Sequence, residues 1–151
     1  MSGCLKKYIM HKSEINKIID EYYEIISNTY SKCSPQVELY DNIYERLSGI
    51  KGMSGTACAK AEYDWSENKI YLYTSRLNDE EDVIKALIHE CVHSTQSKLL
   101  FDIYYEFGYT YDTHPCEVAA KKAEKQWKNI YVAEMDKWMT ELGEKNGKTL
   151  Y

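Results

Sequence analysis

The sequence predicts an α+β fold in a single domain, in which several helices pack against a small β-hairpin. Apolar residues recur every three or four positions over residues 11–32, 79–100 and 115–142, which is the period of an amphipathic helix. Side chains alternate over residues 69–74, which is the period of a strand. The 151 residues suffice for one hydrophobic core but are few for two domains.

The N-terminal third is predicted to hold two helices. The first covers residues 11–32, with Ser13 as the candidate N-cap because its hydroxyl can accept a hydrogen bond from the first turn. A serine-proline pair at 34–35 interrupts the pattern, since proline breaks a helix. Residues 36–48 resume helical spacing as a second, shorter helix. The glycine-containing stretch 49–55 is a loop short enough to lie within one domain.

Residues 56–75 are predicted to form the β-hairpin. The first strand covers residues 56–63, the turn covers 64–68, and the second strand covers 69–74. We expect one of these strands to lie beside the functional cleft. An exposed strand edge there could pair with an extended peptide.

The C-terminal half is predicted to be helical apart from one connection. Residues 79–100 form a helix that begins at Asn78 or Asp79, and residues 101–113 form an aromatic connection. Residues 115–142 then form one long helix with an apolar stripe. Gly143 is its expected end, and residues 1–10 and 144–151 are expected to be flexible ends of the single domain 1–151.

Composition and charge narrow the possible partners. The net charge of −5 and the pI near 5.4 argue against a nucleic-acid surface. No apolar run resembles a signal peptide or approaches a membrane span. The five cysteines are odd in number and irregularly spaced, which is typical of reduced thiols in a cytoplasmic protein.

Residues 89–93, His-Glu-Cys-Val-His, carry the most specific chemical signal in the chain. On a helix, His89 and His93 lie one turn apart, so both imidazoles project from one face and can share a Zn²⁺ ion. Glu90 is placed to accept a proton from a water that the metal activates. The alternative is an exposed helix face with two solvated histidines. Apolar residues through 83–92 indicate instead a helix packed on a core, which favours the metal site.

A third ligand must come from further along the chain. An extended form of the motif has a histidine six residues after His93, but Leu99 stands there. Glu117 is the leading candidate, because Pro115 suits the first turn of a new helix and nearby alanines allow close helix packing. Other candidate ligands remain open at this point: His114, Glu106, Asp112 and Cys116.

Residues 56–127 resemble the gluzincin metallopeptidases, and most closely their small single-domain forms. The shared order is a strand, a His-Glu-x-x-His helix, a loop and a second helix, in which residues 115–120 resemble a Pro-x-Glu-x-x-Ala segment. The resemblance implies a zincin-like metalloprotease domain with one Zn²⁺ per chain and Glu90 as the general base. The implied metal ligands are His89, His93 and Glu117.

The tyrosines after the active-site helix are candidates for substrate contacts. Either they only cover the cleft, or the phenol of Tyr109 or Tyr111 donates to the oxyanion of a tetrahedral intermediate. His114 is a further candidate for such a contact, although it also suits the start of the following helix.

The expected function is hydrolysis of peptide bonds in a peptide or protein substrate, as the resemblance implies. Two alternatives remain at this stage. One is a catalytically inactive zinc-binding protein with a regulatory or interaction role, against which the intact Glu90 argues. The other is a helical binding module in which the histidines are incidental. The sequence gives no prediction of the oligomeric state.

Overall fold

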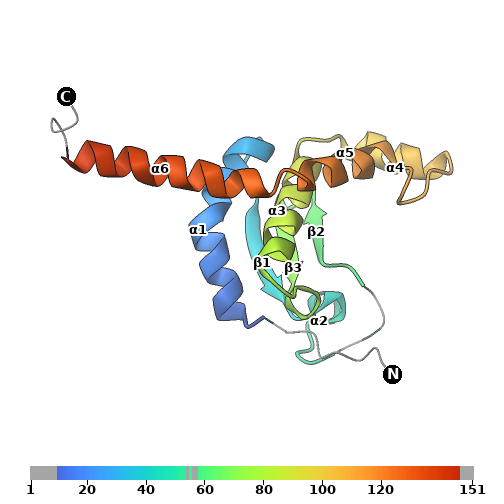
Figure 1. Ribbon diagram of the computed structural model, residues 1–151. Helices are drawn as coiled ribbons and strands as arrows, with labels where there is room; N and C mark the ends of the chain where they lie inside the picture. Colours follow the sequence, from blue (N-terminus) through green and yellow to red (C-terminus); the bar gives the residue numbers. More distant parts are fainter. Residues whose placement is uncertain (1–9, 54, 56–57, 147–151) are drawn as a thin grey trace, which may run out of the picture.

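The computed structural model describes residues 10–53, 55 and 58–146 (Figure 1). Within these ranges the chain forms an α+β fold of six α-helices and one three-stranded mixed sheet. The prediction of an α+β fold is confirmed. No helix in this part of the chain is long and apolar enough to cross a membrane.

The sheet has the strand order β1-β3-β2. The central strand β3 (Lys69–Tyr73) pairs in parallel with β1 (Gln36–Tyr40) and antiparallel with β2 (Ala61–Asp64). The predicted hairpin is therefore confirmed, but its first strand begins only at Ala61; residues 58–60 are not strand, and residues 56 and 57 lie outside the described residues. β2 lies at an edge of this sheet, and its outer side has no strand partner among the described residues.

The prediction of a helix over residues 36–48 is wrong, because β1 occupies its first half. The register of β1 sets Val37 opposite Ile70 and Leu39 opposite Leu72. These apolar residues alternate with polar ones, which is the period of a strand. Pairing with the buried strand β3 stabilises the extended conformation over the helical one. Only the later residues form a helix, α2 (Ile43–Ser48).

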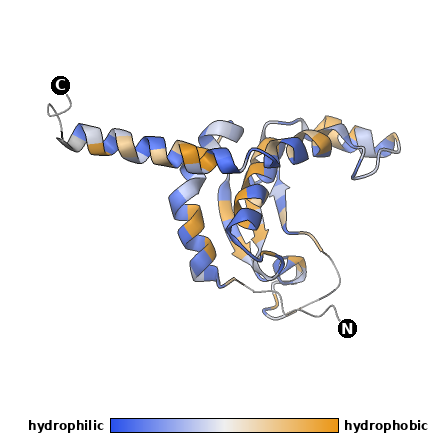
Figure 2. Cartoon of the chain, viewed as in Figure 1, coloured by the Kyte–Doolittle hydropathy of each residue, from blue (hydrophilic) through white to orange (hydrophobic). Residues whose placement is uncertain are grey.

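The hydrophobic core lies between two helices and the sheet. α1 (Lys12–Tyr30) packs against α3 (Glu80–Ser94), and side chains from both join those of β3 in one buried cluster (Figure 1). The predicted first helix is confirmed, but Ser13 lies inside its first turn and His11 is the N-cap. Figure 2 shows hydrophobic segments on α1, α3 and the strands. Fully buried members of the cluster include Ile15, Ile26, Ile70, Leu72, Leu87 and Ile88.

The helix predicted over residues 79–100 ends at Ser94, and a second helix follows after a short turn. Asp79, one of the two predicted candidates, is the N-cap of the first of these helices, α3. The N-cap of α4 (Lys98–Glu106) is Ser97, whose hydroxyl accepts a hydrogen bond from the backbone of Leu100. This serine cap starts a new helix, so residues 101–106 of the predicted aromatic connection are helical and only residues 107–113 connect α4 to the next helix.

The long helix predicted over residues 115–142 is two helices. α5 (Pro115–Glu124) and α6 (Lys128–Asn146) are separated by a turn at 125–127, and α6 continues through Gly143. Only the first part of the predicted apolar stripe on α6 is buried. Ile130 is buried, but beyond it α6 extends away from the body of the molecule (Figure 1). Four apolar side chains of this part are more than half exposed: Val132, Met135, Trp138 and Met139.

Candidate metal centre

The two histidines of the His-Glu-x-x-His motif lie side by side on α3. His89 and His93 are 7% and 4% exposed, and their ring centroids are 4.7 Å apart. The helix that carries them is fixed at its start by Asp79, whose carboxylate accepts a hydrogen bond from the backbone of Asp82 at 2.8 Å. Both imidazoles are therefore held on a rigid, buried helix face, as the one-turn spacing predicts.

Glu117 completes the group from the first turn of α5. Its Oε1 lies 3.5 Å from Nε2 of His89 and also contacts Nε2 of His93. α5 packs against α3, and Ala120 is fully buried one turn after Glu117. Its small side chain allows the two helices to approach closely. The structure thus brings the three predicted ligands together, and their ligand atoms lie within 4.8 Å of one another.

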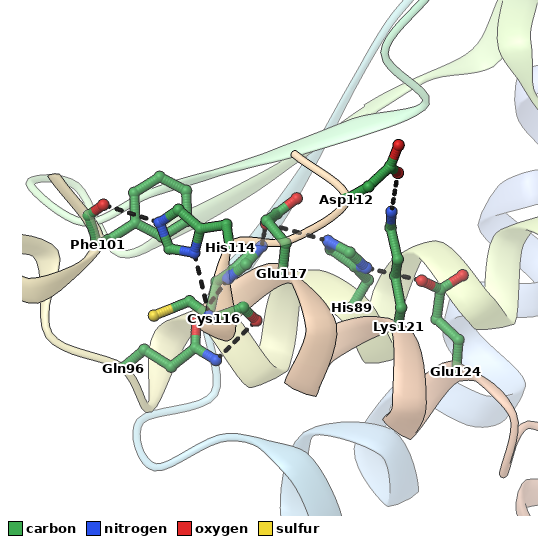
Figure 3. Close-up of polar contacts among 10 residues, drawn as sticks. His89, Gln96, Phe101, Asp112, His114, Cys116, Glu117, Lys121 and Glu124 are labelled. Carbon is green, nitrogen blue, oxygen red and sulfur yellow. Dashed lines mark hydrogen bonds and ion pairs between the residues drawn. The ribbon is translucent and has the colours of Figure 1, made fainter. Parts of the chain in front are cut away.

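The far side of each imidazole is held by a residue that the sequence analysis did not single out. Nδ1 of His89 lies 2.7 Å from Oε2 of Glu124, and Nδ1 of His93 lies 2.7 Å from Oε1 of Gln96 (Figure 3). Spacing could have indicated both residues. Glu124 is seven residues after Glu117 on the same helix face, and Gln96 is three residues after His93.

The ligand group carries opposite charges when no metal is bound. Burial disfavours the charged form of His89, but hydrogen bonds to Glu117 and Glu124 outweigh it and raise the pKa of His89 to about 10. Burial also disfavours the charged carboxylate of Glu117, yet hydrogen bonds from both histidines lower its pKa to about 2. A cation that binds between them must therefore displace a proton from His89.

Glu90 lies beside this group in a cleft of about 630 Å³. Its side chain is buried, and burial raises the pKa of Glu90 to about 7 against the opposing effect of the two histidines. A carboxyl group with a pKa near neutrality can both accept and return a proton. Glu90 is not part of the ligand group, which agrees with its predicted position.

Of the two candidate tyrosines, Tyr111 lines the cleft and Tyr109 is not among its lining residues. Tyr109 packs instead on Tyr104, with ring centroids 5.4 Å apart. Burial and the neighbouring Glu117 raise the pKa of Tyr111 to about 12, so its phenol keeps the proton at neutral pH. The Nζ atom of Lys121 lies 3.9 Å from the centroid of the Tyr111 ring and holds it from α5.

His114 is the N-cap of α5 and is not available as a ligand. Its Nδ1 accepts a hydrogen bond from the backbone of Cys116 at 3.0 Å. Its Nε2 therefore carries the proton and donates to the carbonyl of Phe101 at 2.8 Å (Figure 3). Both ring nitrogens are used, and His114 does not line the cleft, so it does not act as a substrate contact in this arrangement.

The other candidate ligands lie outside the group. Asp112 pairs with Lys121 at 3.1 Å, Glu106 is exposed at the end of α4, and the buried thiol of Cys116 is not part of the group. Trp65, which no motif in the sequence indicates, also lines the cleft. Its ring centroid is 5.8 Å from that of His93, and its indole N–H donates to the carbonyl of Gln96 at 3.1 Å.

The donor set fits a divalent transition metal. Two imidazole nitrogens and one carboxylate oxygen are ligands that Zn²⁺ accepts, and three protein ligands leave a coordination position open. Nδ1 of each histidine faces an acceptor on its far side, so Nε2, which faces Glu117, is the nitrogen available to a metal. The buried group could therefore hold a metal ion.

Comparison with known proteins adds no relative to this description. No protein-family model, curated protein or solved structure matches the chain.

Proposed function

We propose that the protein is a zinc-dependent peptidase with a zincin-like domain, in which His89, His93 and Glu117 hold the ion. The observation that carries the proposal is Glu90, buried in the same cleft as the three ligands but outside the ligand group. A site that only binds metal does not need such a base. The resemblance of residues 56–127 to the gluzincins supports the same reading.

In the proposed mechanism Glu90 transfers protons and Tyr111 stabilises the oxyanion. A zinc ion, when bound, supplies Lewis acidity that makes a water acidic and polarises a carbonyl. Glu90 takes the proton of the attacking water and later gives it to the leaving amine, as a group with a pKa near 7 can do. Tyr111 donates its phenolic hydrogen bond to the oxygen that becomes negatively charged.

The sheet edge supports a peptide as the substrate. Ala61, Glu62 and Tyr63 of β2 line the cleft, and β2 has no strand partner on its outer side within the described part of the chain. An extended peptide can add to such an edge through backbone hydrogen bonds, which do not depend on its sequence. The substrate class proposed is therefore an extended peptide or an unfolded protein segment.

The test compares the zinc-loaded parent with Glu90→Gln on casein and on a peptide library. Gln keeps the volume of Glu90 and is not a ligand, so the variant should keep its fold and its zinc. It should lose hydrolysis by about 10²–10⁴ in rate, because an amide cannot accept the proton. Glu81→Gln, in the first turn of the same helix and with a side chain 43% exposed, is the matched control and should cleave like the parent.

Two results would count against the proposal. Cleavage by Glu90→Gln at the parental rate would show that Glu90 is not the base. A zinc-loaded parent that cleaves no peptide in the library would favour the inactive zinc-binding protein instead.

A further inference from the structure

We propose that Gln96 is a positioning residue that fixes which nitrogen of His93 is available to the metal. Its side-chain amide is itself oriented by a hydrogen bond to the carbonyl of Cys116. This inference rests on the proposed metal site but needs no substrate. Gln96 lies in the turn between α3 and α4, three residues after His93. Figure 3 shows its amide between the ligand group and the start of α5.

The orientation of the Gln96 amide follows from its partner on α5. The backbone carbonyl of Cys116 can only accept a hydrogen bond, and it lies 3.0 Å from Nε2 of Gln96. The NH₂ group must therefore face Cys116, and Oε1 must face the other way. This removes the usual ambiguity of a glutamine amide.

The orientation of the amide in turn sets the tautomer of His93. Oε1 of Gln96 can only accept, and it lies 2.7 Å from Nδ1 of His93. Nδ1 must then donate to Oε1, which leaves Nε2, the atom that faces Glu117, as the nitrogen that can bind a metal. Cys116 directly precedes Glu117, so one amide links two of the three ligands.

The backbone of Gln96 is held independently of its side chain. The indole N–H of Trp65, in the turn between β2 and β3, donates to the Gln96 carbonyl at 3.1 Å. The Trp65 ring also packs 5.0 Å from that of Phe101. The main chain is therefore pinned by the hairpin while the side chain spans α3 and α5, so the amide is preorganised before any metal binds.

His89 achieves the same tautomer by a different route. Its Nδ1 faces the carboxylate of Glu124, which accepts in either orientation. The tautomer of His89 therefore does not depend on an amide orientation, and it serves as an internal reference for His93.

Two variants of Gln96 distinguish two roles of this side chain: orienting the His93 ring, and linking α3 to α5 through the Cys116 carbonyl. Gln96→Met keeps the length of the side chain and removes both hydrogen bonds. Gln96→Glu also loses the donor to Cys116 but keeps an acceptor for Nδ1 of His93. Gln36→Met, at the exposed start of β1, is the matched control.

The measurements are Zn²⁺ affinity against a competing chelator and the ¹⁵N–¹H spectrum of the histidine rings. We expect Gln96→Met to bind Zn²⁺ about 10–100-fold more weakly than the parent. We expect Gln96→Glu to recover most of that loss, and Gln36→Met to match the parent. In the zinc-loaded parent, Nδ1 of both histidines should carry a proton; in zinc-loaded Gln96→Met, only that of His89 should remain protected from exchange.

Equal losses of affinity in the Met and Glu variants would overturn the inference, because bridging to α5 alone would then explain them. If Gln96→Met does not fold, the parent still decides: a His93 ring without a proton on Nδ1 overturns the inference. A parent that binds no Zn²⁺ would instead refute the metal site and with it the proposed function.

Discussion

Cys91 sits between the two ligand histidines in sequence but on the opposite side of α3. Its side chain is fully buried in the hydrophobic core, and burial raises the pKa of its thiol to about 12. Cys33, Cys58, Cys91 and Cys116 all lie outside disulfides, as predicted, and Cys4 lies outside the described residues. Only a thiolate reacts readily with alkylating reagents, so burial should separate these thiols by rate.

We predict that a maleimide reagent labels Cys33 and Cys58 in the native protein well before Cys91. Both are exposed, whereas Cys91 needs unfolding to become a thiolate at neutral pH. Peptide mapping after timed labelling measures the rates, and the urea-unfolded protein is the control in which all sites should react alike. Early labelling of Cys91 would contradict its place in the core.

At the scale of secondary-structure elements, one polar network ties α2 to both strands of the hairpin. The Tyr73 hydroxyl accepts from Nε of Arg46 at 2.7 Å and donates to Glu62 at 2.9 Å. Arg46 also pairs directly with Glu62 at 2.6 Å. Since β2 forms one wall of the cleft, this network helps to fix the wall in place.

We predict that Tyr73→Phe lowers the free energy of unfolding by about 1–3 kcal/mol, because it removes two hydrogen bonds of a buried hydroxyl to charged partners. Tyr40→Phe is the control on the neighbouring strand β1. Its hydroxyl makes one 3.3 Å contact with Glu38, so the loss should stay within about 0.5 kcal/mol. Urea denaturation measures both, and equal losses would argue against a stabilising network.

The ligand helix could be predicted from sequence because its signals are local. The spacing of His89 and His93, the acidic first turn and the apolar stripe all lie within fifteen residues of one element. Glu117 could also be placed, since Pro115 marks a helix start a fixed two residues before it. These features depend on helix geometry alone.

The errors with the largest effect on the fold involve partners distant in sequence. Residues 36–40 read as a helix because the parallel pairing with β3 is not visible from their own spacing. Glu124 lies on the face of Glu117, but its contact with His89 depends on how α5 lies against α3. The outer half of α6 has the spacing of a core-facing helix, yet its apolar side chains face outward. Periodicity tells which residues share a face, but not what that face contacts.

At the scale of the whole molecule, the ligand group makes stability depend on pH. In the metal-free protein the pKa of His89 rises from 6.5 to about 10, so its contribution is complete below pH 6.5 and is lost as pH rises through 10. The pKa of Glu90 rises from 4.5 to about 7, and its contribution is lost as pH rises through 7. The pKa of Glu117 is lowered from 4.5 to about 2, so its contribution to stability is complete above pH 4.5 and is lost only as pH falls through 2.

We predict that the metal-free protein loses stability steadily between pH 7 and 10, and that saturating Zn²⁺ raises its Tm more at pH 9 than at pH 6. Zn²⁺ needs the unprotonated nitrogen of His89, and less proton remains to be displaced at the higher pH. Thermal unfolding with and without zinc measures the difference. A zinc-induced shift that is larger at pH 6 would contradict the assigned charge state.

The central claim is that three residues from two helices, His89, His93 and Glu117, form one metal site. The most direct test is the zinc content of protein purified without chelator, offered zinc and then dialysed, for the parent and for His93→Ala and Glu117→Ala. The account predicts about one zinc per chain in the parent and a strong loss in both variants, since removing one of three ligands leaves too few. A parent ratio near zero, or a Glu117→Ala variant that holds zinc as tightly as the parent, would contradict it.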